Sequence, residues 1–218
     1  MSGDHPVRMP GLLVVLSAPS GAGKGAIRAA VQRRMPDLRY GVSVTTRRAR
    51  PGEEHGVHYE FVDEATFERK VQQGEFLEWA DVYGNRYGTP RQPMEDWLRQ
   101  GIDVIVEKDV QGARALMDLL PDAVYVFILP PSLEELRRRM IQRGTESPEA
   151  RRQRLRSARE ELLAVDRYDY CIVNDDVERA ADRLCAVIQA EKLRVRRFIG
   201  HGRRFWLDGL GDVDGGIH

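Results

Sequence analysis

The chain has 218 residues, 42% of them apolar and 31% charged, and its formal net charge is +0. A chain of this length and composition buries a sizeable core, which excludes disorder of the whole chain and predicts one compact domain with small inserted lobes. The balanced charge argues against a general nucleic-acid or membrane-surface binder, because the phosphate contacts of such proteins need a large basic excess.

The first predicted elements are a strand, a loop and a helix. Residues 12–17 form an apolar run that ends in Pro and Gly, typical of a buried parallel strand followed by a tight loop, and a helix is expected over residues 24–34. Small residues at a helix N-terminus let backbone N–H groups approach phosphate oxygens. Lys24 adds a positive charge there and is one of only four lysines in an arginine-rich chain. We therefore interpret residues 18–24 as a phosphate-binding loop rather than as a plain glycine-containing turn.

This loop departs from the complete phosphate-loop pattern, G-x-x-x-x-G-K-[ST]. Ala18 replaces the first glycine, and Gly25 and Ala26 replace the hydroxyl residue that normally follows the lysine. Because that hydroxyl helps to hold Mg²⁺, we expect the metal ion to depend here on phosphates, waters and carboxylates elsewhere.

The middle of the chain predicts an inserted unit and the rest of the sheet. Residues 40–62 are rich in Val and Thr and are broken by Pro51, Gly52 and Gly56, which predicts a small antiparallel insertion. Three further apolar runs of strand length are residues 102–106, 124–129 and 170–173. Strands that alternate with helices predict a parallel sheet covered on both faces, with ligands bound beyond the carboxyl ends of its strands.

The last third of the chain contains an arginine-dense segment and a glycine-rich end. Residues 133–165 have apolar side chains at helical spacing, which predicts two helices joined around residues 144–148. From about residue 194 the chain loses clear periodicity. Cys171 and Cys185 lack C-x-x-C spacing, which favours buried packing in a reducing compartment, and the first ten residues lack the apolar stretch of a signal peptide. We therefore expect a cytoplasmic protein.

Three segments resemble the guanylate kinase family in order and spacing, namely residues 17–24, 43–53 and 174–176. The middle segment is the most specific, because its Thr-Thr-Arg-x-x-Arg-x-Gly-Glu run is followed by Gly-x-x-Tyr. The resemblance covers residues 12–192. It implies an α/β fold of the P-loop NTPase type, a parallel sheet flanked by helices with a small inserted GMP-binding β lobe and a helical lid. It also implies ATP-dependent phosphorylation of GMP, and of dGMP, to GDP, with Mg²⁺ as the cofactor.

The resemblance divides the single domain, residues 1–218, into four parts. These are a core at residues 10–42, 94–132 and 166–193, a GMP-binding lobe at 43–93, a lid at 133–165 and a tail at 194–218.

A carboxylate and hydroxyl groups recognise the guanine base on the family pattern. Guanine offers N1–H and N2–H donors side by side and an O6 acceptor, so a selective pocket needs acceptors at one edge and donors at the other. Glu78 would accept from both donors with help from Asp109, and Ser43 and Thr89 would donate to O6. The side chains expected to bind the GMP phosphate are Arg47, Arg50, Tyr59 and Tyr87. Turn caps, solvated arginines and core tyrosines are the alternative roles of these residue types.

The resemblance places ATP between the loop and the lid. The residues expected to bind ATP are Ala18, Pro19, Ser20, Gly21, Ala22, Gly23, Lys24, Gly25, Ala26 and Asn174. The expected catalytic residues are Lys24, Arg137, Arg143 and Arg154, because phosphoryl transfer mainly needs positioning and positive charge around the transferred group. For the segment after the last strand, a helix N-cap at Asn174 or Asp175 is an equally physical role.

Glu107 and Asp109 are expected to help position Mg²⁺ through water. An apolar residue usually separates these two acids in the family, and Lys108 departs from that pattern. Strand alternation points Lys108 toward a layer that is normally apolar, so its ammonium group is expected to extend outward to solvent.

Two other functions stay open at this point. The missing hydroxyl after Lys24 suits a catalytically silent guanylate-kinase-like module that binds a peptide, and the loop and lid also suit a kinase of another phosphorylated acceptor. Glu78 together with Ser43 favours GMP. We expect ATP and GMP as the partners, with no nucleic acid and no membrane, and we make no prediction of the oligomeric state.

Overall fold

The computed structural model describes residues 10–82, 84–142 and 156–199. Its larger sheet has five parallel strands in the order β2-β7-β1-β8-β9. These strands are β1 (Leu13–Ser17), β2 (Arg39–Gly41), β7 (Val104–Lys108), β8 (Val124–Leu129) and β9 (Tyr170–Val173). Every residue of β1 is buried, because β1 lies in the centre with helices on both faces. The predicted strands at 124–129 and 170–173 are confirmed, whereas the strand predicted at 102–106 begins two residues later and extends to Lys108.

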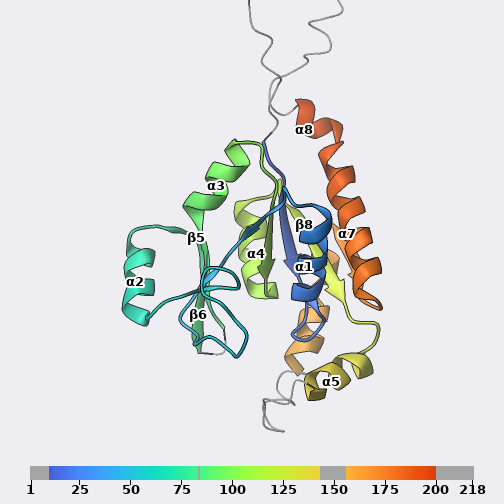
Figure 1. Cartoon of the computed structure of the whole chain (residues 1–218), viewed down its shortest axis with the longest axis horizontal. Helices are drawn as coiled ribbons and strands as arrows, with labels where there is room; N and C mark the ends of the chain where they lie inside the picture. The colour runs from blue at the N-terminus through green and yellow to red at the C-terminus, as the bar shows by residue number, and fades with distance from the viewer. Residues whose placement is uncertain (1–9, 83, 143–155, 200–218) are drawn as a thin grey trace, which may run out of the picture.

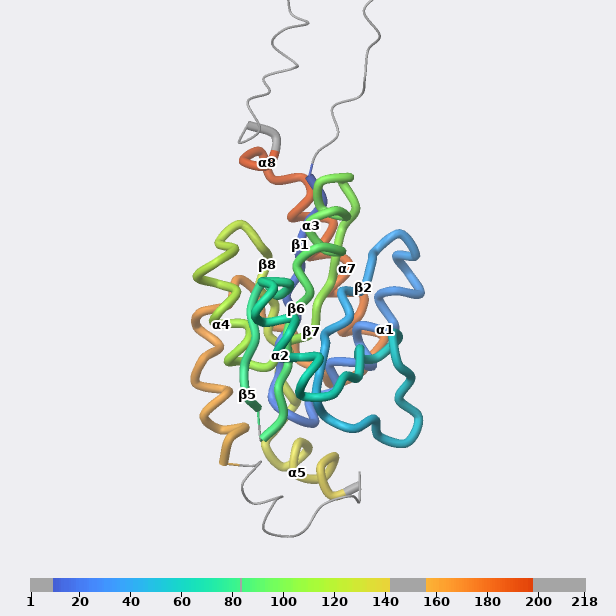
Figure 2. Tube along the Cα trace, turned by 90° about the vertical axis from the view of Figure 1, so that its left-hand side faces the viewer, coloured from blue at the N-terminus to red at the C-terminus, as the bar shows by residue number. Residues whose placement is uncertain are grey.

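Helices cover both faces of the main sheet (Figures 1 and 2). Alternation along the strands builds a separate apolar layer on each face. Val14 and Leu16 of β1 face α1 (Lys24–Arg34) and α7 (Val177–Lys192). Leu13 and Val15 of the same strand face α3 (Arg91–Arg99) and α4 (Val110–Leu119). The α/β fold and the helix predicted over 24–34 are confirmed.

The smaller sheet forms the inserted lobe, on the left in Figure 1, with strand order β4-β3-β6-β5. Its elements are β3 (Val44–Thr45), β4 (Glu60–Phe61), α2 (Glu64–Gln72), β5 (Phe76–Val82) and β6 (Asn85–Pro90). The antiparallel insertion predicted over 40–62 is wrong in two respects. Tyr40 belongs to β2 of the main sheet, and β3 pairs parallel with β4, because a long connection brings the chain back in the same direction. The antiparallel partner of β3 is β6.

The segment predicted as a lid begins with α5 (Leu133–Gln142), beside the loop after β1 (Figure 1). A second helical stretch covers residues 156–162 and leads to the short 3-10 helix η1 (Val165–Arg167). The junction predicted around 144–148 lies outside the described residues.

The C-terminal part of the described chain ends in α8 (Val195–Ile199), so helical structure continues past the predicted start of the aperiodic tail. Cys171 is exposed on β9 and Cys185 is partly buried, so the predicted buried packing is wrong for Cys171. The pattern could not show this, because β9 is the edge strand of the sheet. Within residues 10–82, 84–142 and 156–199, none of the helices combines the length and the apolar character that crossing a membrane requires.

Candidate active site

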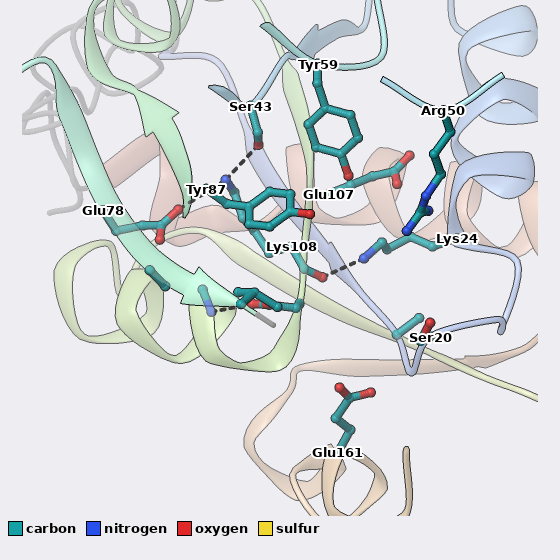
Figure 3. Close-up of a pocket in the computed structure, with 15 residues that line it drawn as sticks. Ser20, Lys24, Ser43, Arg50, Tyr59, Glu78, Tyr87, Glu107, Lys108 and Glu161 are labelled. Carbon is teal, nitrogen blue, oxygen red and sulfur yellow. Dashed lines mark hydrogen bonds and ion pairs between the residues drawn. The ribbon is translucent and has the colours of Figure 1, made fainter. Parts of the chain in front are cut away.

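One cleft joins the carboxyl ends of β1 and β7 to the lobe and to the helical stretch 156–162 (Figure 3). Ser17 and Lys108, the last residues of β1 and β7, are paired in register, so the loop after each strand starts from the same edge. Crevices at this edge of a parallel sheet are the usual ligand sites of α/β proteins. The predicted phosphate-loop and base-pocket residues meet in this cleft.

The loop after β1 depends on two glycines in the left-handed region. Gly21 has φ 93° and Gly23 has φ 91°. A Cβ atom at Gly23 would lie 2.4 Å from Asn174 Nδ2, which itself donates to the Ala22 carbonyl at 2.6 Å. The N-cap residue of α1 is Gly23, which has no side chain with which to cap the first N–H groups of the helix. Lys24 Nζ donates to the Lys108 carbonyl at 2.7 Å.

The acidic end of β7 faces this loop. Glu107 accepts from Arg28 Nε at 2.9 Å, and its carboxylate lies 3.7 Å from where a Cβ atom of Gly25 would be. Asp109 caps α4 by accepting from the Gly112 N–H at 2.7 Å. The described part of the chain has no cluster of three or more acidic, His or Cys side chains able to hold a metal ion.

The residues predicted to bind the base include a buried ion pair that the sequence did not predict. Lys108 Nζ lies 3.1 Å from Glu78 Oε1 and donates to Ser43 Oγ at 2.9 Å (Figure 3). Thr89 Oγ1 donates to the same Glu78 oxygen. The side chains of Lys108 and Glu78 are each 6% exposed, so the expectation that Lys108 extends outward to solvent is wrong. Its ammonium stays inside because a carboxylate on the neighbouring lobe supplies the opposite charge.

A cluster of hydrogen-bonded side chains joins the loop between β3 and β4 to β6. Arg47 donates to Glu53 Oε1 at 2.9 Å and to Tyr87 Oη at 3.2 Å, and Glu53 Oε2 accepts from the Arg50 N–H at 2.8 Å. Partial burial acts to raise the pKa of Glu53, but the hydrogen bonds from Arg47 and from the Arg50 backbone outweigh it and lower that pKa. Arg50, Tyr59 and Tyr87 line the cleft. Arg50 and the two tyrosines thus line the cleft, and Arg47 is bonded to one of these tyrosines, which together make a donor set suited to a phosphate group.

Burial, together with the nearby charge of Glu107, raises the pKa of Tyr59 to about 12, so this side chain is a neutral O–H donor in the cleft. Its ring packs edge to face against the ring of Tyr87, with the two ring centroids 5.9 Å apart. The contact fixes both phenols on the same wall.

Comparison with known proteins identifies the family from sequence and from structure. The family model "Guanylate kinase" matches residues 11–191. The chain is 51% identical to the guanylate kinase of Carboxydothermus hydrogenoformans over 187 residues, 86% of this chain and 92% of that protein. It is 52% identical to the guanylate kinase of Symbiobacterium thermophilum over 192 residues, 88% of this chain and 91% of that protein. This chain belongs to the guanylate kinase family.

The crystal structure of guanylate kinase from Anaplasma phagocytophilum agrees, with a TM-score of 0.73, 37% identity and coverage of 89% of this chain and 93% of that one. The P-loop NTPase-type fold implied by the family resemblance is thereby confirmed.

The structure places only some of the arginines predicted for the lid. Arg137 is exposed on α5, whereas Arg139 of the same helix donates to the carbonyls of Ala22 at 3.5 Å and of Asn174 at 3.2 Å. Arg143 and Arg154 lie outside the described residues. Helical spacing alone could not separate Arg137 from Arg139 in so arginine-dense a segment.

Asn174, the first residue after β9, supports the phosphate loop instead of capping a helix. Asn174 is buried, and its amide holds the Ala22 carbonyl. The N-cap of α7 is Asp176, which accepts from the Arg179 N–H at 2.9 Å, so the capping role considered for Asn174 or Asp175 is wrong. The sequence does contain the capping residue, Asp176, but one position after Asp175.

Glu161 is a cleft residue that the motifs did not indicate. It comes from the helical stretch 156–162 and points toward Ser20 of the phosphate loop (Figure 3). Burial, joined by the charge of Asp109, raises its pKa to about 7 against the lowering effects of the Ser20 N–H and of Lys24. No pattern in the sequence could have found it, because its neighbours in the cleft come from distant segments.

Proposed function

We propose that this guanylate kinase transfers the γ-phosphoryl group of ATP to GMP, and to dGMP, giving ADP and the corresponding diphosphate. The observation that carries the proposal is the single cleft in which Lys24 of the phosphate loop and the Glu78 and Ser43 base pocket face one another. A continuous cleft lets two bound nucleotides bring their phosphates together without a covalent protein intermediate.

ATP is expected on the phosphate loop. Loop N–H groups and the N-terminus of α1 would bind the ATP phosphates, and Lys24, whose ammonium group has three donors, would add a bond to a phosphate oxygen while it keeps the Lys108 carbonyl. Asn174 lies directly beside this loop, where the family pattern expects the adenine.

GMP is expected between the lobe and β7. Glu78 would accept from the N1–H and N2–H groups of guanine with Asp109 nearby, and Ser43 would donate to O6. Thr89 donates its hydroxyl proton to Glu78, so it would donate to O6 only after turning this proton away from the carboxylate. The donor set for the GMP phosphate is Arg47, Arg50, Tyr59 and Tyr87. Adenine presents the opposite pattern at the same atoms and would mismatch both edges.

The residues of the cleft suit an Mg²⁺ ion that arrives bound to ATP. Glu107 and Asp109 provide oxygen donors beside the loop, and Gly25 leaves open the space that a loop side chain would fill. Mg²⁺ in such sites keeps several waters and binds one or two carboxylates plus phosphates, which agrees with this donor set. When bound with ATP, the ion neutralises phosphate charge. The lid residues Arg137, Arg143 and Arg154 would supply positive charge to the transferred group.

An assay of the purified chain with ATP and Mg²⁺ tests the proposal against GMP, dGMP, AMP and UMP. We expect turnover with the two guanine nucleotides and none of comparable size with AMP or UMP. Glu78→Gln is expected to raise KM for GMP about 10- to 100-fold with a small change in kcat, because an amide cannot accept from both guanine donors. Absence of turnover with every acceptor would instead favour the binding-module alternative. We also place the reaction in the cytoplasm.

A further inference from the structure

We propose that Lys108 determines base specificity by fixing the direction of the hydrogen bonds in the GMP pocket. This inference rests on the proposed function, because it concerns the same guanine-binding residues. It assigns a role to Lys108, a residue at which this chain departs from the family pattern.

The first step is the position of the ammonium group. Lys108 is the last residue of β7, Ser43 precedes β3 and Glu78 lies on β5, so three segments distant in the sequence meet at one nitrogen. Lys108 is 6% exposed and also lines the cleft. A buried ammonium at this place is a built part of the pocket and not a side chain that happens to lie over it.

The second step concerns Ser43. A lysine ammonium has three donors and no acceptor, so Ser43 Oγ must accept at 2.9 Å and its own proton points elsewhere. Ser43 lines the cleft and is 4% exposed. The serine hydroxyl is therefore oriented to donate, and the nearby positive charge disfavours the approach of another N–H group. This side of the pocket suits the O6 acceptor of guanine and opposes the 6-amino donor of adenine.

The third step concerns Glu78. Its Oε1 atom accepts from Thr89 and lies 3.1 Å from Lys108 Nζ, whereas Oε2 lies 3.5 Å from where a Cβ atom of Gly112 would be. Oε1 is thus held by the protein, and Oε2 stays available for the donor edge of the base. Lys108 acts on both edges of guanine through other side chains, which makes it a positioning residue.

The decisive probe is 6-thio-GMP, which keeps both guanine donors and replaces O6 by sulfur, a weaker acceptor. In the intact chain we expect GMP to have the lower KM. Lys108→Met should raise KM for GMP about 10- to 100-fold, and lower the KM ratio of 6-thio-GMP to GMP about fivefold or more. The value of kcat should change less than about threefold, because the side chain lies at the base and not at the transferred phosphoryl group.

Lys70→Met is the matched control, because Lys70 lies in the same lobe and pairs with Glu75 at 2.9 Å on the surface of α2. It should leave both KM values unchanged. If Lys108→Met raises both KM values equally, so that their ratio equals that of the intact chain, the residue is only structural and the inference is overturned.

A second variant keeps the test decisive if the unpaired Glu78 carboxylate prevents folding of Lys108→Met. The double variant Glu78→Gln with Lys108→Met buries no charge. Its KM ratio of 6-thio-GMP to GMP should still be lower than that of the single variant Glu78→Gln. An equal ratio in these two variants would also overturn the inference. Failure of the proposed function has a different signature, since the intact chain would then lack GMP turnover or Glu78→Gln would leave KM for GMP unchanged.

Discussion

The carboxyl group of Glu161 makes the stability of the protein depend on pH near neutrality. Its Oε2 atom is buried and has no hydrogen-bond partner among the described residues. Burial and the charge of Asp109 raise its pKa from 4.5 to about 7, against the opposing effects of the Ser20 N–H and Lys24. The folded chain therefore keeps a proton that the unfolded chain releases between pH 4.5 and 7. Because the folded state then binds more protons, the free energy of unfolding falls as pH rises through this window.

The magnitude follows from the size of the shift. A rise of the pKa to about 7 corresponds to about 3 kcal/mol at most, and the partial exposure of the side chain lowers this to about 1–2 kcal/mol. Glu161→Gln removes the ionisation and keeps the shape. We therefore expect its free energy of unfolding, relative to the unmodified chain, to increase by about 1–2 kcal/mol between pH 5 and pH 8.

Urea unfolding of the full chain at pH 5, 6.5 and 8 measures this difference. The control is Glu134→Gln, because Glu134 is exposed on α5 and is not one of the groups that shift the pKa of Glu161. Its difference from the unmodified chain should not vary with pH. A constant difference for Glu161→Gln across the three pH values would refute the reasoning.

Three further substitutions test separate parts of the structure. Lys24→Ala should lower kcat roughly 100-fold with a smaller change in KM for GMP, and an effect confined to KM would show that this lysine does not act on the transferred phosphoryl group. Arg47→Ala should raise KM for GMP about tenfold. In the unmodified chain the lowered pKa of Glu53 stabilises the fold above pH 4.5, and this contribution is lost on acidification. Thermal unfolding of Arg47→Ala should show the loss of the share of this contribution that Arg47 provides. Gly88→Ala should destabilise the lobe by about 1–3 kcal/mol, because its Cβ atom would lie 2.7 Å from the Phe76 ring, and an unchanged melting temperature would contradict the close contact.

Local patterns were sufficient for most of the main sheet. The helix predicted at 24–34 and the strands predicted at 124–129 and 170–173 have those bounds in the structure, because each is a short apolar or amphipathic run with clear ends. The lobe was harder, because β3 has only two residues and its partners β4 and β6 are chosen by long-range pairing. A two-residue strand carries too little periodicity to show which partner it will have.

The candidate site shows the same division between local and distant information. The phosphate loop was visible because its residues are contiguous, and the family pattern placed Glu78 and Ser43. The burial of Lys108 could not be predicted, because alternation along β7 shows which face of the sheet the side chain lies on but not that the Glu78 carboxylate lies on the same side. Glu161 was missed for a similar reason, since its raised pKa results from groups far away in the sequence.

Lys108 touches both halves of the cleft with different atoms. Its carbonyl accepts from Lys24 of the phosphate loop at 2.7 Å, and its ammonium binds Ser43 and pairs with Glu78. The two contacts are separable, because substitution of the side chain leaves the carbonyl in place. Loss of the ammonium should thus change acceptor recognition, while the main-chain support of Lys24 and with it the turnover step persist. Under the proposed function, the carboxyl end of this one strand would contribute to the ATP site through its backbone and to the GMP site through its side chain.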